Sequence, residues 1–327
     1  MSKAFKKEII IDNHCHIFNQ DCIATELTGR FTKNIDLNPV KKILRYFHNW
    51  FDDNDPLDRL REFITLCKIS NTTETAEALL KESRFKGQNI QLVFTLLMMD
   101  TEYAVKDHSD ADQLPKKNFA RQKREMTDAV LKHPGRFLPF IAADPRRIEA
   151  RNGIKYITNA LETQGFWGVK IYPPLGYFPN DPRLHPLYEY CEDNGIPITA
   201  HCLYGGFFSD ESVPENINQK KKPEKNKYYW KMANPENWEP VLDKYEDLKL
   251  NLGHFGGDIF GTKGLIFKRK DKAQINIERK WRETIEGYLE HYNNVYADLA
   301  YIEAMFCEPD QYFKRLKKYS ENGKILK

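Results

Sequence analysis

The chain has 327 residues and carries 50 Lys and Arg against 47 Asp and Glu, a net charge of +3 with the two signs interspersed. This balance argues against a dedicated nucleic-acid-binding protein, which presents a one-sided basic surface, and favours a small-molecule partner. Hydrophobic residues make up 41% and aromatic residues 13% of the chain, enough for a substantial core and too many for a disordered protein.

The six cysteines form no CxxC pair and are too sparse for a disulfide framework or a zinc ribbon. The first residues lead into a short strand, without the apolar segment and small-residue cleavage site of a secretory signal. No apolar run approaches the ~20 residues that a membrane helix needs. We therefore predict a cytoplasmic protein that acts on a small molecule, with no membrane or nucleic-acid partner; a homo-oligomer is compatible with the sequence.

The first predicted strand covers residues 8–16 and ends in the most informative motif, Asp12-Asn13-His14-Cys15-His16. Alternation along a strand sends positions i and i+2 to the same face, so His14 and His16 project side by side with Asp12 behind them. Two histidines placed in this way can hold one metal ion. A lone pair of this kind more often faces solvent or hydrogen-bonds to a neighbouring loop, so other residues must support the metal.

Further β-rich runs recur along the chain with helical stretches between them. With the first, the predicted strands cover 8–16, 90–98, 137–144, 168–173, 196–202, 248–255 and 295–301. Parallel neighbours need a connection of a dozen or more residues, so this spacing predicts parallel βα units. We expect an α/β fold, a TIM (β/α)8-type barrel that forms a single domain over residues 1–327, since such barrels commonly occupy ~250 residues or more.

Three connections are long. Between the first two strands lie about seventy residues, far more than a usual βα loop, and they include helix-like stretches at 37–51 and 55–69. We predict that residues 31–88 form a helical lid or cap insertion within the barrel. The segment 205–237 is predicted to be a solvated loop. The connection before the seventh strand is predicted to contain a helix over residues 275–291.

Polar side chains gather at the carboxyl ends of the predicted strands, the edge where a parallel barrel builds its site. His201 ends the fifth strand and His254 the sixth, where Gly253, Gly256 and Gly257 predict close approach of the backbone to a ligand or a neighbouring strand. Either histidine alone is more often a satisfied core or loop residue. Together with the first-strand pair they lie at the ends of three strands of one barrel. Three imidazoles around one centre suit a borderline cation such as zinc.

Two charged residues inside predicted strands leave alternatives open. An inward Lys170 is costly unless it is paired, deprotonated or modified. It could bind a substrate carboxylate, or be carboxylated on its amine and bridge two metals, whereas an outward Lys170 would lie beneath a helix. Asp298 could position a ligand or accept hydrogen bonds from neighbouring strands. Cys15 and Cys202 adjoin the candidate ligands, but alternation points them to the opposite face, where we expect them to pack.

Several segments of the chain, taken in sequence order, resemble the amidohydrolase superfamily, specifically the amidohydrolase-related branch that includes aminocarboxymuconate-semialdehyde decarboxylase. The matching segments are Ile11 to His16, Gly168 to Pro174, Gly195 to His201, Pro235 to Trp238 leading to Leu250 to Gly257, and Val295 to Leu299. The resemblance implies a TIM barrel in which His14, His16 and His201 bind a divalent metal, usually zinc. It further implies that His254 acts near the substrate or as another ligand. Such a metal lowers the pKa of a bound water and polarises a carbonyl.

The chain departs from this family at the eighth strand, which in the hydrolases carries an aspartate that binds the metal and takes a proton from water. Here a predicted helix at 310–320 is followed by residues 323–327, which resemble the opening of that strand, and no such aspartate follows. We therefore expect a barrel that is incomplete at strand eight. The abrupt stop favours a truncated product of a longer enzyme over an impaired enzyme.

Three functions follow from these observations. The first is a metal-dependent hydrolase of the amidohydrolase type that uses a metal-activated water on a C–N or ester-like bond, with His254 and Lys170 as catalytic residues. The second is a nonoxidative decarboxylase of a small carboxylic acid on the same site, which an anchoring role of Lys170 would favour. The third is a catalytically impaired or truncated barrel that acts as a binding protein.

Overall fold

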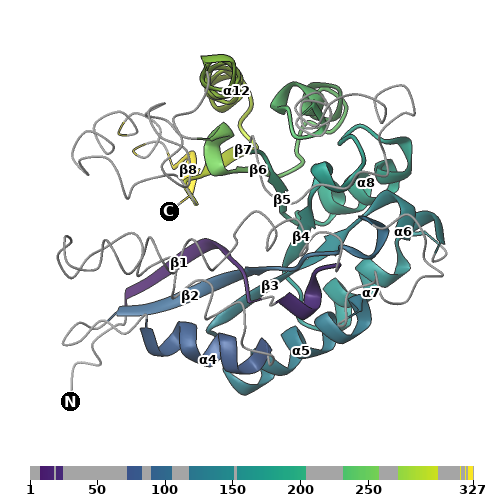
Figure 1. Ribbon diagram of the computed structural model, residues 1–327, viewed down its shortest axis with the longest axis vertical. Helices are drawn as coiled ribbons and strands as arrows, with labels where there is room; N and C mark the ends of the chain where they lie inside the picture. The colour runs from purple at the N-terminus through teal and green to yellow at the C-terminus, as the bar shows by residue number, and fades with distance from the viewer. Residues whose placement is uncertain are drawn as a thin grey trace, which may run out of the picture.

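One parallel sheet organises the protein, seen here in a computed structural model that describes residues 8–17, 20–24, 72–82, 90–104, 118–150, 153–203, 231–257, 272–300, 317, 321 and 323–326. Its strands are β1 (Glu8–Cys15), β2 (Ile90–Leu97), β3 (Phe137–Ala143), β4 (Gly168–Ile171), β5 (Ile198–His201), β6 (Leu250–Gly253), β7 (Val295–Asp298) and β8 (Ile325–Leu326). Each strand pairs in parallel with the next along the chain. The sheet curls into a nearly closed barrel with an open seam between β8 and β1 (Figure 1).

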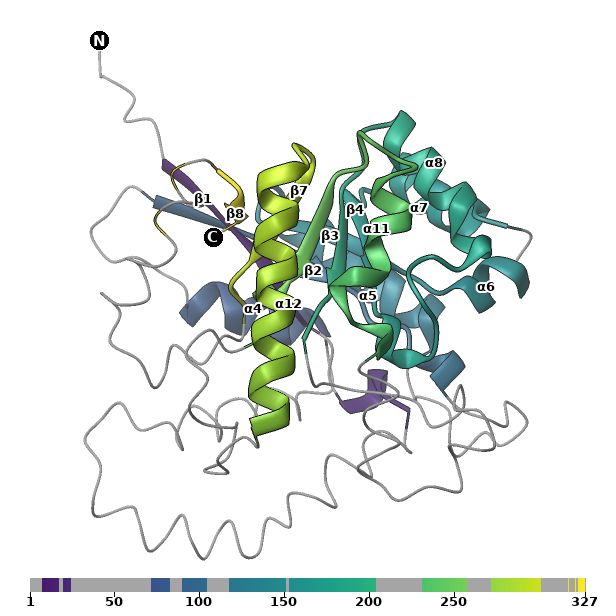
Figure 2. The ribbon, with the colours of Figure 1, turned by 90° about the horizontal axis from the view of Figure 1, so that it is seen from above.

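Helices connect the strands and lie on the outside of the sheet (Figures 1 and 2). They are α4 (Thr72–Glu82), α5 (Phe119–Lys132), α6 (Pro145–Ala150), α7 (Lys155–Thr163), α8 (His185–Asp193), α11 (Glu239–Leu242) and α12 (Lys272–His291). Short 3-10 turns follow several strands: η1 (Gln20–Cys22), η2 (Glu102–Ala104), η3 (Pro173–Leu175), η4 (Pro182–Leu184), η5 (Pro235–Trp238) and η6 (His254–Gly256). In the described part of the chain, no helix is long and apolar enough to cross a membrane.

This architecture confirms the predicted α/β barrel and its incompleteness at one seam. The seven predicted strands are all present, and each ends one to three residues before its predicted end because the chain turns into a loop there. The middle of the sheet is covered on both faces, since every residue of β4, β5 and β6 is buried. β1, at the seam, differs: Ile9 is 62% exposed and its two isoleucine neighbours are also exposed.

The predicted insertion at residues 31–88 is described only in part. Its described portion within that range is α4, which packs beside α5 on the outside of the sheet (Figure 1). The Thr72 hydroxyl donates a hydrogen bond to the Glu125 carboxylate of α5. The remaining residues of the insertion lie outside the described residues, as do residues 205–230 of the predicted loop at 205–237 and all but residue 317 of the predicted helix at 310–320. A lid over the site therefore stays a prediction.

Side-chain bonds join the loops that surround the carboxyl ends of the first three strands. The Arg147 guanidinium, at the start of α6, donates to both carboxylate oxygens of Asp100, at 2.6 and 2.9 Å, and to Glu102 at 2.7 Å. The Thr101 hydroxyl donates to the Cys22 carbonyl oxygen at 3.1 Å and accepts from the Ala24 N–H at 3.0 Å. Bidentate and paired contacts of this kind fix loop geometry, so the edge that carries the candidate site is well anchored.

We expect a substitution at Gly168, the first residue of β4, to destabilise the barrel. A Cβ added there would lie 2.5 Å from the Phe140 ring and 2.7 Å from the Pro197 carbonyl oxygen, so backbone as well as side chain must shift. Gly168→Ala should lower the free energy of unfolding by about 1–3 kcal/mol, the usual cost of overpacking. Urea denaturation of the purified variant measures this change.

Gly287→Ala is the matched control, because nothing lies within 4 Å of a Cβ added at this position of α12. The higher helix propensity of alanine should raise the free energy of unfolding there by up to about 1 kcal/mol. Equal stability of the two alanine variants would contradict the close packing at Gly168.

Candidate metal centre

The structure brings together the four predicted histidines at the carboxyl ends of β1, β5 and β6. The ring centroids of His16 and His14 lie 5.2 Å apart and those of His14 and His254 4.5 Å apart. The ring centroids of His254 and His201 lie 4.8 Å apart. The rings therefore form a continuous row, although the histidines belong to three different strands.

β1 and β6 reach this arrangement through two local irregularities. The pairing of β1 with β2 shifts between Asp12 and Cys15, so the strand is not regular where it carries His14. On β6, a Cβ at Gly253 would lie 3.0 Å from Cε1 of His14 and 3.0 Å from the Ala200 carbonyl oxygen. Only glycine leaves room there for the imidazole, which accounts for the close approach predicted from the sequence.

A left-handed turn follows β6. His254 and Phe255 have φ of 68° and 47°, and Gly256 and Gly257 continue with φ of 74° and 114°. A left-handed conformation costs a non-glycine residue roughly 1–2 kcal/mol, so two such residues in succession must be held by their surroundings. The Gly256 N–H donates to the Cys202 carbonyl oxygen at 3.1 Å. α12 packs against the turn, with Trp281 next to Gly256 and Glu278 next to Gly257.

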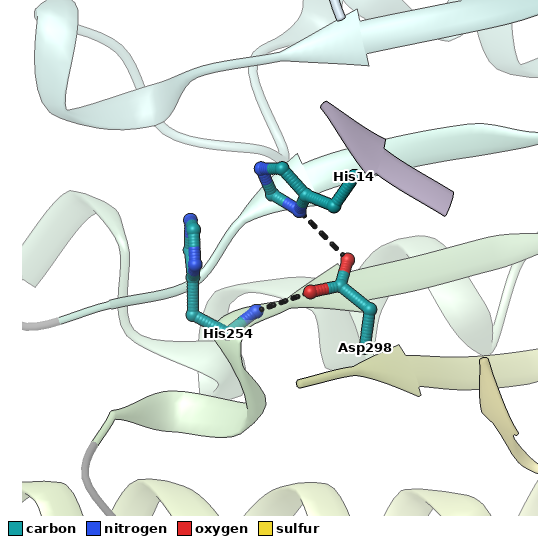
Figure 3. A group of neighbouring side chains, drawn as sticks. All are labelled: His14, His254 and Asp298. Atoms are coloured by element: carbon teal, nitrogen blue, oxygen red, sulfur yellow. Dashed lines mark hydrogen bonds and ion pairs between the residues drawn. The ribbon is translucent and has the colours of Figure 1, made fainter. Parts of the chain in front are cut away.

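The Asp298 carboxylate is the common acceptor at the centre of the site (Figure 3). Its Oδ2 lies 2.8 Å from Nδ1 of His14 and accepts from Nδ2 of Asn251 at 2.8 Å. Its Oδ1 accepts from the backbone N–H groups of His254 at 3.0 Å and Ala300 at 3.1 Å. Burial alone would raise the pKa of this carboxyl, but the neighbouring His14 and the donated hydrogen bonds hold the pKa well below its usual value. The accepting role that the sequence allowed for Asp298 is thus the one observed.

Because Asp298 is ionised, Nδ1 of His14 carries the proton of their hydrogen bond, and the remaining ring nitrogen of His14 is Nε2. That Nε2 atom is buried and has no hydrogen-bond partner among the described residues. Nδ1 of His16 lies 2.8 Å from the Leu97 carbonyl oxygen, which can only accept, so it too carries a proton. Burial holds the pKa of His16 well below its usual value, which leaves the ring neutral with a lone pair on Nε2.

The same reasoning fixes the other two rings. Nδ1 of His254 lies 2.7 Å from the Ala300 carbonyl oxygen and therefore donates. Burial lowers the pKa of His254 to about 3, so its Nε2 is unprotonated and accepts from Nδ1 of His201 at 3.1 Å. His201 then also carries its proton on Nδ1. In all four imidazoles, these contacts place a proton on Nδ1.

His14, His254 and Asp298 could hold one metal ion, because their candidate ligand atoms lie within 4.8 Å of one another (Figure 3). The bonds just described argue against this set. Four donors already fill the acceptor capacity of the Asp298 carboxylate, and Nε2 of His254 accepts from His201.

The residues present nevertheless fit a divalent metal. A ligating histidine usually donates its other ring N–H to a carboxylate or a carbonyl oxygen, and His14 and His16 do so. The buried, unpartnered Nε2 of His14 is the observation that decides the fit. The assignment of His14, His16 and His201 as ligands stays a prediction, as does a catalytic role for His254, whose two ring nitrogens both contact neighbours.

Lys170 takes the inward orientation, one of the two that the sequence allowed. It is 1% exposed, and its Nζ has no hydrogen-bond partner among the described residues. Burial lowers the pKa of this ammonium to about 8, partly opposed by Asp298. Its charge in turn contributes to lowering the pKa of His16 and His254, so the ammonium lies within electrostatic range of both imidazoles.

The sequence reasoning missed two residues of the site. Asn251 donates to Asp298 and, at 3.3 Å, to the Thr199 hydroxyl, and its Oδ1 is buried without a partner among the described residues. Its position two residues before Gly253, on the same face of β6, was the available signal. Tyr172, directly after β4, stacks on His201 with centroids 4.1 Å apart. A tyrosine after a buried strand gives no comparable signal.

A family model described as amidohydrolase matches residues 11–320. The chain belongs to this amidohydrolase family. No curated protein matches this chain. Solved structures similar to it include an uncharacterised TIM-barrel protein from Bordetella bronchiseptica, with 17% identity and a TM-score of 0.43 over 89% of this chain and 75% of that chain.

Two further solved structures similar to this chain are those of decarboxylases. The 5-carboxyvanillate decarboxylase from Novosphingobium aromaticivorans, in complex with manganese and 4-hydroxy-3-methoxy-5-nitrobenzoic acid, has 13% identity and a TM-score of 0.50 over 99% of this chain and 85% of that chain. The 2,6-dihydroxybenzoate decarboxylase from Rhizobium has 13% identity and a TM-score of 0.45, over 90% of this chain and 80% of that chain. At 13% identity, the likeness to the 5-carboxyvanillate decarboxylase shows a shared fold and nothing more.

We expect the metal-free protein to lose stability in mild acid. His16 and His254 are neutral in the folded state but titrate near 6.5 when unfolded, so the unfolded chain binds more protons below that pH. The free energy of unfolding should therefore fall as the pH drops below 6.5 toward about 3, the folded pKa of His254. The slope approaches about 1.4 kcal/mol per pH unit for each histidine.

Urea unfolding between pH 5 and 7 measures this slope. His254→Gln removes one of the two titrating groups, so the variant should show a shallower dependence than the parent chain. The same slope in both proteins would contradict the neutral state assigned to His254.

Proposed function

We propose that this chain is a metal-dependent nonoxidative decarboxylase of a small aromatic carboxylic acid. The unpartnered ammonium of Lys170, buried beside the imidazoles, carries this proposal. A buried cation without a counter-ion is costly, and a substrate carboxylate would supply the missing charge and hydrogen-bond acceptor. Support also comes from the 5-carboxyvanillate decarboxylase, which has the same fold and whose structure holds manganese and a nitrobenzoic acid.

His14, His16 and His201 would hold a divalent metal such as Zn²⁺ or Mn²⁺ through their Nε2 atoms. When bound, such an ion supplies positive charge that orients substrate oxygens and stabilises the negative charge that develops as carbon dioxide leaves. Asp298 keeps the His14 ring in the required tautomer, and His254 does the same for His201.

Lys170 would act at the substrate. Its ammonium binds the carboxylate and holds it in the dry interior, where an electrostatic contact is stronger than in water. Decarboxylation breaks the bond between the ring carbon and the carboxyl carbon, releases carbon dioxide, and requires one proton at the ring carbon. The Nζ of Lys170 holds a proton within the site, and its pKa of about 8 is close to the range suited to proton transfer at neutral pH.

A hydrolase on the same site is the second candidate, because the family and the metal-ligand set are shared. It needs a general base that takes a proton from water. Asp298, the carboxylate beside the imidazoles, has a pKa well below its usual value and four hydrogen bonds, which makes it a poor base. A non-catalytic binding protein is the third candidate and predicts ligand binding without turnover.

Metal analysis tests the ligand set. We expect about one equivalent of Mn²⁺ or Zn²⁺ per parent chain after loading, and loss of most of it in His14→Ala, His16→Ala and His201→Ala, since three ligands are needed for a stable site. His254→Gln should bind the metal more weakly without losing it, because it removes the acceptor of the His201 Nδ1 proton but no ligand. Elemental analysis after gel filtration gives the stoichiometry, and circular dichroism confirms that each variant is folded.

The opposite pattern, with metal lost in His254→Gln and retained in His16→Ala and His201→Ala, would instead identify His14, His254 and Asp298 as the ligands. An unloaded but folded parent chain would contradict the metal-dependent function altogether.

Lys170→Met tests the anchoring role. Because it removes an unpartnered buried ammonium, the variant should be at least as stable as the parent. Its kcat/KM for carbon dioxide release from a panel of hydroxylated benzoic acids should fall by about a hundredfold, the effect of removing one partner of a buried charge pair. Lys249→Met, at an exposed lysine, is the matched control.

Release of an amine or alcohol from ester and amide substrates, with no carbon dioxide from any acid, would favour the hydrolase. Substrate binding with neither product would favour the binding protein. An unchanged kcat/KM in a decarboxylating Lys170→Met variant would remove Lys170 from the mechanism.

A further inference from the structure

Tyr172 makes a face-to-face ring contact with one of the histidines. Its ring lies parallel to that of His201, with an interplanar angle of 20° and centroids 4.1 Å apart. His254 meets the same imidazole edge-on, at 70°. The His201 ring thus has a flat neighbour against its face and a hydrogen-bond partner at its Nδ1 atom.

Tyr172 is itself held firmly through its backbone. Its backbone N–H donates to the hydroxyl of Tyr177 at 2.8 Å, and that hydroxyl donates to the Ala143 carbonyl oxygen of β3 at 3.0 Å. Pro173 and Pro174 follow, and the proline ring fixes φ of each. The side chain is 7% exposed and belongs to a separate apolar cluster at the ends of the strands, formed by Ile23, Ala24, Met99, Ala104, Tyr172 and Leu175.

Two constraints are needed to orient an imidazole. The terminal torsion of histidine is broad, so the ring plane is not set by rotamer preference. The hydrogen bond from Nδ1 of His201 to Nε2 of His254 restrains rotation about the Cβ–Cγ bond through a single contact. A flat surface against the ring face removes this rotation and so fixes the direction of the Nε2 lone pair.

We propose that Tyr172 is a positioning residue for His201 and that its stacked ring aims the Nε2 lone pair at the metal centre. The inference rests on the proposed role of His201 as a metal ligand. Tyr177 supports it indirectly, because its hydroxyl holds the backbone of Tyr172.

Four variants of the full chain separate positioning from general stability. Tyr172→Phe keeps the stacked ring, whereas Tyr172→Leu removes it. Tyr177→Phe removes only the hydroxyl that holds the Tyr172 backbone. This variant tests the proposal if Tyr172→Leu does not fold. Tyr288→Leu is the matched control, since Tyr288 is likewise buried, at 8% exposed, and its ring contacts that of Tyr292 with centroids 5.6 Å apart.

Affinity for Mn²⁺, measured by competition with a fluorescent chelator, is the first readout. Tyr172→Leu should bind Mn²⁺ about tenfold or more weakly than the parent, as is usual for residues that orient metal ligands. Tyr172→Phe and Tyr288→Leu should bind like the parent, and Tyr177→Phe should lie between. An affinity loss in Tyr288→Leu equal to that in Tyr172→Leu, or none in Tyr172→Leu and Tyr177→Phe, would overturn the proposal.

The ¹⁵N chemical shifts of the His201 ring in metal-free protein are the second readout and need no metal. We expect the parent and Tyr172→Phe to show one tautomer protonated on Nδ1, and Tyr172→Leu or Tyr177→Phe to show exchange between tautomers. Unchanged ring shifts in both of these variants would overturn the positioning role. A parent chain that binds no Mn²⁺ but shows the expected shifts would contradict the proposed function while leaving the positioning of His201 by Tyr172 intact.

Discussion

The candidate site depends on one buried carboxylate. Asp298 receives four hydrogen bonds, from two side chains and two backbone N–H groups. Through them it fixes the tautomer of His14 and the backbone of the left-handed turn at His254. The turn also places the His254 ring, whose Nε2 accepts a hydrogen bond from Nδ1 of His201. A charge removed from water is stable only when it is fully hydrogen-bonded, and here the same bonds that satisfy the carboxylate arrange the imidazoles around it.

Burial then determines the charge state of the site. The imidazoles of His16 and His254 are neutral because desolvation disfavours their protonated forms. Lys170 is the exception, since its pKa falls only to about 8. The site therefore combines neutral nitrogen donors, which suit a metal, with one cation, which suits an anionic substrate. The neutral imidazoles and the cationic lysine are both consequences of burying these side chains inside the barrel.

Much of this arrangement could be predicted from the sequence, because it follows from the periodicity of strands. Positions i and i+2 put His14 and His16 together, and parallel strands bring His201 and His254 to the same edge. The inward orientation of Lys170 could not be decided, because one step of register reverses it. The four bonds of Asp298 were beyond prediction for another reason. They depend on the proximity of β1 to β7 and on left-handed backbone at His254 and Phe255, a conformation that neither residue type favours.

The incomplete barrel gives the bond between His14 and Asp298 a second consequence. The two residues belong to β1 and β7, which lie on opposite sides of the seam, and β8 contributes only two residues between them. Their contact joins the first and last long strands of the sheet where no backbone pairing between β8 and β1 is found in the described part of the chain. The candidate metal centre and the seam of the barrel thus share one contact. A substitution in this pair would therefore alter the candidate site and the architecture together.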